Sequence, residues 1–356
     1  MKAAVWYAAH DVRVTDVPDP ESPGVGEVTV QVEWCGICGS DFHEYLHGPI
    51  TIPVGEPHPL TGYKAPMILG HEFSGTVVAV GAGVTHLEVG SRVVPDACRA
   101  CWECYWCKRM QYNICEKGAL TGLSAPGGLA EYVNLPAYTC YEMPDALTFE
   151  EGALVEPMAV GFHAVRKAPV VAGETVAVVG AGTIGIAALQ SARAAGAAEV
   201  IVLDPIESRR KMARDLGASA VIDPTDGDPV AAVRAMTGGI GADIVIECVG
   251  AGNSDQLAVD LTRRGGKTVL LGIFAGPSTI DWFSVVTQEK QIIGAVTYNG
   301  EFKPVMQMIA DSRLDVAPLI SKRIGLSEIV ESGFEYLVAH KADTMKVLVT
   351  PREPVA

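Results

Sequence analysis

The sequence predicts an α/β protein of two domains, and three observations support this. Its 356 residues exceed what a single compact core usually carries. In the first 150 residues, glycine and proline interrupt short β-branched segments every few positions, which is typical of a barrel or an irregular β domain. After about residue 157, strand-like and helical segments alternate, which indicates a doubly wound parallel sheet covered on both faces.

Individual segments follow from their residue patterns. In the β-rich part, alternating or β-branched residues predict strands at 28–34, 75–80 and 92–95. In the second part we expect strands at 175–179, 199–203, 220–222, 244–249, 268–272 and 291–295, and helices at 184–195, 208–216 and 229–236. From residue 301 onward we expect a helix, a strand at 319–324, a helix near 326–340 and a strand at 346–350. The pattern alone does not decide which domain this last part joins.

Composition excludes several classes of protein. With 27 Lys and Arg against 42 Asp and Glu, the net charge is −15, which argues against a nucleic-acid partner. The 49% of hydrophobic residues excludes wholesale disorder. Residues 1–10 are too short an apolar run for a signal peptide, and residues 175–189 are too short to span a bilayer. An odd count of nine cysteines does not indicate a disulfide framework, which favours a reducing compartment. From these features together we expect a soluble, cytoplasmic protein without a membrane partner.

A glycine-rich turn predicts a dinucleotide site. Residues 176–185 are V-A-V-V-G-A-G-T-I-G, an apolar strand followed by G-x-G-x-x-G at the start of a helix. Gly180 would allow the tight turn, Gly182 the close approach of pyrophosphate, and Gly185 the contact between helix and sheet. Asp204 lies 19 residues further on and would accept hydrogen bonds from the adenosine ribose, which favours NAD over NADP. Arg209 and Arg210 could soften that preference, and the alternative is a turn whose glycines serve packing alone.

Five cysteines, at positions 98, 101, 104, 107 and 115, fall within eighteen residues and predict a metal site. An iron–sulfur cluster needs a gap of three residues before its last cysteine and usually a proline after it. The last short gap here is two residues, and Lys108 follows Cys107. Four thiolates around a structural zinc therefore fit better, with one cysteine to spare.

A second, dispersed group predicts an open metal site. It comprises C-G-I-C-G-S-D-F-H at 35–43, G-H-E at 70–72 and E-P at 156–157. One thiolate, one imidazole and one or two carboxylates would leave zinc a position for water or substrate, as catalysis requires. Read alone, Cys35 and Cys38 could be a redox pair, but they end a β-rich segment rather than the strand of a βαβ unit.

Together these motifs resemble the zinc-dependent medium-chain dehydrogenase/reductase family over essentially the whole chain. The motifs are residues 35–43, G-H-E-F-S-G-T-V-V-A-V-G at 70–81, the cysteine lobe at 98–115 and G-A-G-T-I-G at 180–185. The resemblance implies a GroES-like catalytic domain at 1–157 with a structural-zinc lobe at 95–118. It also implies a Rossmann NAD-binding domain at 158–299, and a segment at 300–356 that completes the catalytic domain.

By the same resemblance, Cys38, His71 and Glu156 are expected to bind the catalytic zinc. Glu72 would either bind the zinc directly or lie just outside its ligands. Asp41 would orient His71. The family's lobe spacing matches Cys101, Cys104, Cys107 and Cys115, with Cys98 a possible substitute. Cys35, Cys140 and Cys248 are left as small buried side chains. Two zinc ions per chain are thus implied.

The resemblance also implies the reaction. Zinc would stabilise the alkoxide of a secondary alcohol, Ser40 would accept the hydroxyl proton, and the proton would pass through the nicotinamide ribose to His43 and solvent. NAD would take the hydride. The expected cofactor-binding residues are Gly180, Gly182, Thr183, Ile184, Gly185, Asp204 and Arg209.

Substrate prediction depends on less specific motifs. Residues 46–53 (L-H-G-P-I-T-I-P), 58–62 and 153–160 are similar to 2,3-butanediol dehydrogenases (acetoin reductases), which favours a small secondary alcohol or vicinal diol. Sorbitol, xylitol and threonine dehydrogenases are the alternatives within the family, and a catalytically silent zinc-lobe or iron–sulfur protein is the alternative outside enzymes. A zinc-free quinone reductase is disfavoured because it would lack these ligands. Phe42, Trp282 and Tyr298 are candidate pocket walls, and a homodimer or homotetramer is expected.

Overall fold

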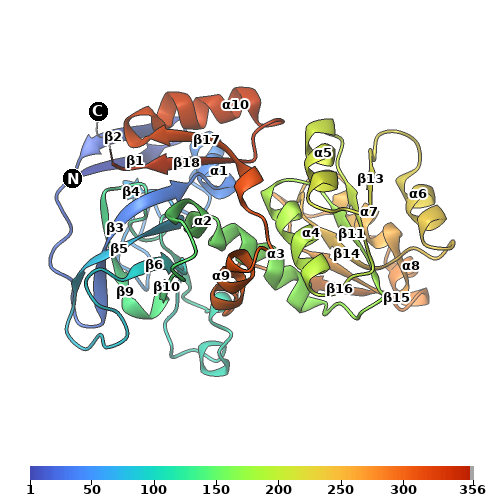
Figure 1. The fold of residues 1–356 in the computed structure, drawn as a ribbon, viewed down its shortest axis with the longest axis horizontal. Helices are drawn as coiled ribbons and strands as arrows, with labels where there is room; N and C mark the ends of the chain where they lie inside the picture. Colours follow the sequence, from blue (N-terminus) through green and yellow to red (C-terminus); the bar gives the residue numbers. More distant parts are fainter. Residues whose placement is uncertain (353–356) are drawn as a thin grey trace. The chain divides into compact units, whose positions relative to one another are not determined.

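Two compact units make up the chain in this computed structural model, which describes residues 1–352 (Figure 1). Unit 1 comprises Met1–Glu156, Phe302–Ala310 and the residues from Val316 onward. Unit 2 comprises Pro157–Glu301 and Asp311–Asp315. No described helix has both the length and the hydropathy needed to cross a membrane.

Unit 1 is built on β-sheets. Its largest sheet has seven strands in the order β10-β6-β5-β3-β18-β17, with β9 also paired to β3. A three-stranded sheet has the order β2-β1-β4, and β7 pairs with β8. The strands are β1 (Lys2–Ala8), β2 (Asp11–Asp16), β3 (Glu27–Gly36), β4 (Met67–Ile68), β5 (Glu72–Val80), β6 (Arg92–Pro95), β7 (Cys98–Arg99), β8 (Ala119–Leu120), β9 (Tyr132–Pro136), β10 (Cys140–Glu142), β17 (Ile320–Gly325) and β18 (Lys346–Thr350).

Strand β3 is the centre of unit 1 because it pairs with three neighbours, β5, β9 and β18, all antiparallel. Its alternate residues Val28, Val30 and Val32 have no exposed surface, as a strand with one face in the core requires. The residues after β3 carry the predicted metal ligand Cys38. The core strand therefore positions the start of the predicted site.

Helices in unit 1 are short. They are α1 (Gly39–His47), α2 (Phe149–Ala153), the first residues of α3 (Val155–Lys167), α9 (Phe302–Ala310) and α10 (Tyr336–His340), with 3₁₀ turns at Cys107–Arg109, Tyr112–Ile114, Ala137–Thr139, Ala317–Leu319 and Leu326–Glu328. The prediction of one helix over 326–340 was wrong in detail, because a π-helical segment, Ile329–Glu335, separates the 3₁₀ turn from α10.

Residues after 316 join unit 1 through strand pairing. Strand β18 pairs antiparallel with β3, where Leu348 faces Gly36 and Val349 faces Cys35. On its other side, β18 pairs parallel with β17. The last described strand thus lies directly beside the segment that leads to Cys38.

Unit 2 contains a six-stranded parallel sheet in the order β13-β12-β11-β14-β15-β16. In chain order this is 3-2-1-4-5-6, the doubly wound arrangement of dinucleotide-binding folds, and it confirms the predicted fold class. The elements are β11 (Thr175–Val179), α4 (Thr183–Ala194), β12 (Glu199–Leu203), α5 (Glu207–Asp215), β13 (Ala220–Ile222), α6 (Pro229–Met236), β14 (Ala242–Glu247), α7 (Ser254–Leu261), β15 (Thr262–Leu270), α8 (Trp282–Thr287) and β16 (Gln291–Gly294).

Candidate active site and metal centres

The predicted ligand Cys38 directly precedes helix α1 and is its N-terminal capping residue. The Asp41 carboxylate accepts a hydrogen bond from the Cys38 backbone N–H at 3.0 Å and from the Gly70 N–H at 3.4 Å. Asp41 has no exposed surface, and burial raises its pKa. The carboxylate therefore joins the α1 segment to the segment that carries His71 and Glu72.

The side chains of Cys38, His71 and Glu72 form a cluster whose candidate ligand atoms all lie within 4.8 Å of one another. Burial raises the pKa of the Cys38 thiol, and the negative charge of Glu72 raises it further. A thiolate here therefore requires a cation, and thiolate, imidazole and carboxylate are the ligand types that zinc takes. The donor set fits a zinc ion.

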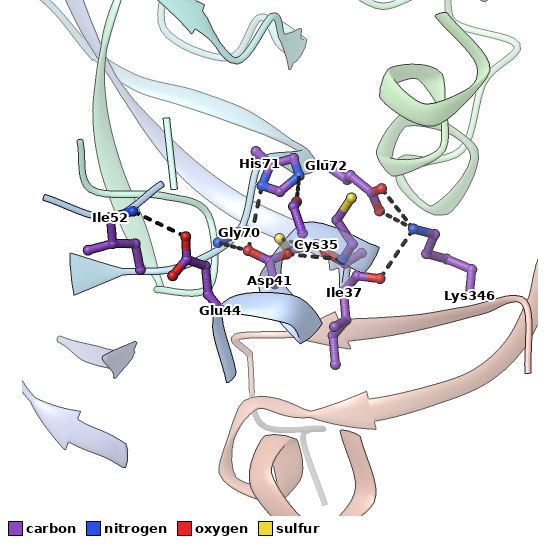
Figure 2. Close-up of polar contacts among 12 residues, drawn as sticks. Cys35, Ile37, Asp41, Glu44, Ile52, Gly70, His71, Glu72 and Lys346 are labelled. Carbon is purple, nitrogen blue, oxygen red and sulfur yellow. Dashed lines mark hydrogen bonds and ion pairs between the residues drawn. The ribbon is translucent and has the colours of Figure 1, made fainter. Parts of the chain in front are cut away.

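His71 lies between two predicted functional side chains, Asp41 and Ser40, and Figure 2 shows its contact with Asp41. Its Nδ1 is 3.5 Å from Asp41 Oδ1, and its Nε2 is 3.1 Å from Ser40 Oγ. Burial alone would lower the pKa of His71, but the charges of Asp41 and Cys38 outweigh it and raise the pKa well above its usual value. Asp41 thus lies on the side of the ring away from Ser40, where a residue that orients the imidazole has to be.

Glu72 pairs with Lys346, a residue that sequence reasoning did not select (Figure 2). Burial alone would lower the pKa of Lys346, but the charges of Glu72 and Cys38 outweigh it and raise the pKa. The two residues are 274 positions apart, and no local motif connects them. In the sequence, the sign of such a role is that a lysine begins strand β18, whose next three residues are apolar.

Glu156 is buried in α3 and lies outside the three-residue cluster of Cys38, His71 and Glu72. Its charge still contributes to the raised pKa values of His71 and Lys346. The described structure thus brings Glu72 together with Cys38 and His71, and it places Glu156 nearby.

His43 lies one turn after Ser40 in α1 and is exposed. Partial burial, together with the positive charges of Lys341 and His47, lowers its pKa. The ring stacks near that of His47, with 6.3 Å between their centroids. Its position at the surface suits exchange of a proton with solvent.

Glu44 is a second residue that sequence reasoning missed. Its buried carboxylate accepts hydrogen bonds from the backbone N–H groups of Ile50 at 2.9 Å, Ile52 at 3.1 Å and Thr51 (Figure 2 shows the bond from Ile52). One side chain of α1 therefore holds the start of the loop whose sequence supported the substrate prediction.

The cysteine lobe contains a four-thiol cluster. Its members are Cys101, Cys104, Cys107 and Cys115. The Sγ of Cys115 is 3.5 Å from that of Cys101. Backbone N–H groups donate to several of these sulfurs, and those of Cys107 and Glu116 lower the pKa of Cys104 to about 6. Four close thiols without an oxygen or nitrogen ligand fit a closed structural zinc site.

The other cysteines lie outside both clusters. Cys98 is buried in β7, and its backbone N–H donates to Asp96 Oδ1 at 2.7 Å. Cys35 and Cys140 are buried, whereas Cys248 is partly exposed at the end of β14. Within the described chain, Cys98 is thus the lobe cysteine that the cluster leaves out.

The three glycines of the turn between β11 and α4 have different surroundings. Gly180 has a φ of 93°, which favours glycine. A Cβ at Gly185 would lie 1.8 Å from the Gly180 carbonyl oxygen, whereas a Cβ at Gly182 would meet nothing within 4 Å. Gly182 is also the N-terminal cap of α4, so the open space lies at a helix end that favours anions. The turn therefore fits a dinucleotide pyrophosphate.

Asp204 follows β12 and is buried beside this turn. Its carboxylate accepts hydrogen bonds from the Ala181 N–H at 2.7 Å and the Ile206 N–H at 2.8 Å. Arg209 Nη1 lies 4.0 Å from Asp204 Oδ2. Thr183 and Ile184 form the first turn of α4. The structure thus gathers the predicted cofactor residues of unit 2 around one helix end.

The three candidate pocket walls have different environments. Phe42 is buried in unit 1, whereas Tyr298 is fully buried in unit 2. Trp282, also in unit 2, is 59% exposed. Their role at a substrate pocket stays a prediction.

Family models, related proteins and solved structures all match this chain. The family model "Alcohol dehydrogenase GroES-like domain" matches residues 24–145, and "Zinc-binding dehydrogenase" matches residues 183–311. The chain is 38% identical over 352 residues to the (R,R)-butanediol dehydrogenase of Bacillus subtilis (strain 168), covering 99% of this chain and 100% of that one. It is 37% identical over 352 residues to the sorbitol dehydrogenase of Bos taurus, covering 97% and 94%. The crystal structure of 2R,3R-butanediol dehydrogenase from Bacillus subtilis matches with a TM-score of 0.92 at 37% identity and covers 99% of each chain.

Proposed function

The chain belongs to the zinc-dependent medium-chain alcohol dehydrogenase family, and from this premise we propose that it interconverts 2,3-butanediol and acetoin with NAD. Its class, an oxidoreductase that acts on CH–OH groups, follows from the family. The observation that carries the proposal is the Cys38–His71–Glu72 cluster, in which His71 and Glu72 are buried and Cys38 is partly exposed, with Ser40 hydrogen-bonded to His71. This arrangement supports an open metal site with a proton acceptor beside it.

Cys38 and His71 are the proposed protein ligands of the catalytic zinc, with Glu72 or Glu156 as the third ligand. Zinc, when bound, supplies Lewis acidity that lowers the pKa of an alcohol hydroxyl and polarises a carbonyl group. Ser40 Oγ, beside His71 Nε2, is positioned to accept the hydroxyl proton, and His43 on the next turn exchanges it with solvent. Asp41 holds His71 in orientation from the opposite side of the ring.

Glu156→Ala tests the third ligand. We expect lower zinc occupancy at the catalytic site or lower turnover, because a buried carboxylate near His71 and Lys346 would be lost. A Glu156→Ala protein with full activity and two zinc ions per chain would contradict its role.

For the cofactor, the proposed site is the turn at Gly180–Gly185 with Asp204. The nicotinamide ring, when bound, supplies the hydride acceptor. A buried carboxylate fixed by two backbone N–H groups would repel a 2′-phosphate, which supports NAD over NADP. Measured kcat/KM values with the two cofactors test this, and a preference for NADP would overturn it.

The substrate proposal is supported by the similarity to butanediol and sorbitol dehydrogenases, whose named substrates both carry neighbouring hydroxyl groups. The deciding experiment is a panel of NAD-linked assays with butanediol stereoisomers, acetoin, sorbitol, xylitol and threonine. We expect the highest kcat/KM with butanediol or acetoin. Failure with both, together with strong oxidation of sorbitol, would move the substrate to the polyols.

A second copy of the chain is the proposed partner. Helix α8 exposes Trp282, Phe283 and Val286, the last two by 78% and 73%, and it directly precedes β16, an edge strand of the parallel sheet. Exposed apolar side chains next to an unpaired strand edge favour association. Light scattering should give a dimer or tetramer, and a Phe283→Asp/Val286→Asp protein should dissociate. A monomeric unmodified protein would refute this.

A further inference from the structure

Glu44 is a buried carboxylate that binds three successive backbone N–H groups. Only 1% of the residue is exposed. Its Oε2 accepts the N–H of Ile50 at 2.9 Å, and its Oε1 accepts those of Thr51 and Ile52 (Figure 2 shows the bond from Ile52). A carboxylate has acceptors only, whereas a carboxamide would turn an NH₂ group toward one of these donors. The three N–H groups therefore require a carboxylate at this position.

These bonds fix the backbone of residues 50–52, and a buried side chain holds the same segment. Ile52 is 3% exposed and belongs to the hydrophobic core that contains Phe42 and Tyr45 of α1. Ile50, by contrast, is 62% exposed. The segment is thus held at the carboxylate and in the core, and Ile50 is the apolar side chain that it leaves at the surface.

The turn between α1 and this segment is closed onto Glu44. The Gly48 N–H and Trp6 Nε1 both donate to the Glu44 carbonyl oxygen, at 3.0 and 2.9 Å. A Cβ added at Gly48 would lie 2.5 Å from that oxygen and 2.6 Å from Glu44 Oε2. The backbone and the side chain of Glu44 therefore both contact the turn, and no side chain fits between them.

Glu44 also connects this segment to the predicted active site. It lies four residues after Ser40, on the same face of α1, and Ser40 Oγ is 3.1 Å from His71 Nε2. Side chains on a helix lean toward its N-terminus, so the Glu44 carboxylate lies over the turn that begins with Ser40. The segment bound to this carboxylate is part of residues 46–53, whose sequence favoured a small diol. It is therefore drawn back toward the proposed proton acceptor.

We propose that Glu44 is a positioning residue that holds Ile50 beside the substrate, where its side chain contacts the methyl group on the carbon that is not oxidised. In 2,3-butanediol each carbinol carbon carries a methyl group. The distal one is removed from water when it packs against Ile50, which favours binding. The inference rests on the proposed function and names the residues that recognise the apolar end of the diol.

Two diols that differ by this one methyl group test it, 2,3-butanediol and 1,2-propanediol. The variants are Ile50→Ala, Glu44→Gln and the double variant. Glu27→Gln is a matched control, because the Glu27 carboxylate also accepts a loop N–H in unit 1, that of Gly24 at 3.0 Å, but belongs to β3. The kcat and KM values for each diol are measured at saturating NAD, together with the zinc content of each protein.

In Ile50→Ala we expect the ratio of kcat/KM for butanediol to that for propanediol to fall about tenfold or more, the effect of one lost apolar contact. The change should lie in KM, because the distal methyl group is bound equally in the ground state and in the transition state. Glu44→Gln should lower the same ratio without touching substrate, and the double variant should lower it no further, since both act through one contact. Glu27→Gln should leave the ratio unchanged.

An unchanged ratio in Ile50→Ala would overturn the contact with substrate. An unchanged ratio in Glu44→Gln, or additive losses in the double variant, would overturn the positioning role. If Glu44→Gln does not fold, Glu44→Asp takes its place, because it keeps the charge but is one methylene too short to reach all three N–H groups. An unmodified protein that oxidises neither diol would refute the proposed function and this inference with it, whereas an active protein whose ratio ignores both substitutions would refute this inference alone.

Discussion

Gly182 and Gly185 lie in one turn, but an alanine at each would meet different surroundings. At Gly182 the added Cβ has nothing within 4 Å, and the φ of −70° is one that any residue adopts. Gly182→Ala should therefore leave the free energy of unfolding unchanged or raise it by about 0.4–1 kcal/mol. At Gly185 the added Cβ would lie 1.8 Å from the Gly180 carbonyl oxygen, so Gly185→Ala must distort the turn and destabilise the protein.

The affinity for NAD, unlike the stability, should fall in Gly182→Ala. If the pyrophosphate occupies the open space at Gly182, a methyl group there moves it away from the N–H groups of α4. A hydrogen bond to a charged group contributes about 1.5–3 kcal/mol, so losing one weakens NAD binding roughly 10- to 150-fold. Gly182→Ala should thus be a stable protein that binds NAD poorly.

Two assays test these expectations. Thermal unfolding without cofactor measures stability, and titration with NAD, monitored by the quenching of tryptophan fluorescence, measures cofactor affinity. Gly55→Ala is a matched control, because its added Cβ also meets nothing within 4 Å and it lies in unit 1. Unchanged NAD affinity in Gly182→Ala would refute the assignment of this turn to the pyrophosphate. Equal stability of Gly185→Ala and the unmodified protein would refute its assignment to packing.

Three further predictions concern the metal sites and the proton path. Ser40→Ala should reduce kcat by about two to four orders of magnitude, as expected for a general acid–base group, and near-normal turnover would exclude the proton path. Cys104→Ser should lose about one zinc per chain and unfold at lower temperature, whereas Cys98→Ser should keep its zinc; metal analysis of both decides between the two cysteines. Partial burial and the charge of Lys341 hold the pKa of His43 below its usual 6.5, and only the neutral ring accepts a proton. Alcohol oxidation should therefore rise with pH through a midpoint below 6.5, and Lys341→Met should move the midpoint upward, whereas an unshifted pH profile would contradict a role for His43.

Unit 2 shows what local sequence can predict about the fold. The predicted strands at 175–179, 199–203 and 220–222 have the same bounds in the structure, because each consists mostly of a short continuous apolar run. The segment 326–340 shows the limit. Gly333 in its π-helical part packs against Ile37, where an added Cβ would lie 2.8 Å from Cδ1. Such a contact between distant segments leaves no periodic signal.

The predicted site shows the same division. Cys38 and His71 lie in short motifs with a chemical signature, so the sequence alone proposed them as neighbours, and the structure brings them together. Lys346 and Glu44 have no motif, because their role depends on what surrounds them. Lys346 reaches the site only through the pairing of β18 with β3, and the backbone partners of Glu44 belong to an irregular loop. Neither set of contacts is marked in the sequence by a periodic pattern or by a fixed residue spacing.

The pairing of β3 with β18 also sets an order of events during synthesis. Lys346 is made 309 residues after Ile37, which at roughly 5–20 residues per second is a delay of about 15–60 s. Unit 2 is almost continuous in the chain and can fold within that interval. The edge of β3 near Cys35, which pairs with β18 in the folded protein, stays unpaired during this time. An unpaired edge of this kind invites pairing with other chains. The nascent protein therefore exposes this edge of β3 to other chains until its last described strand is made.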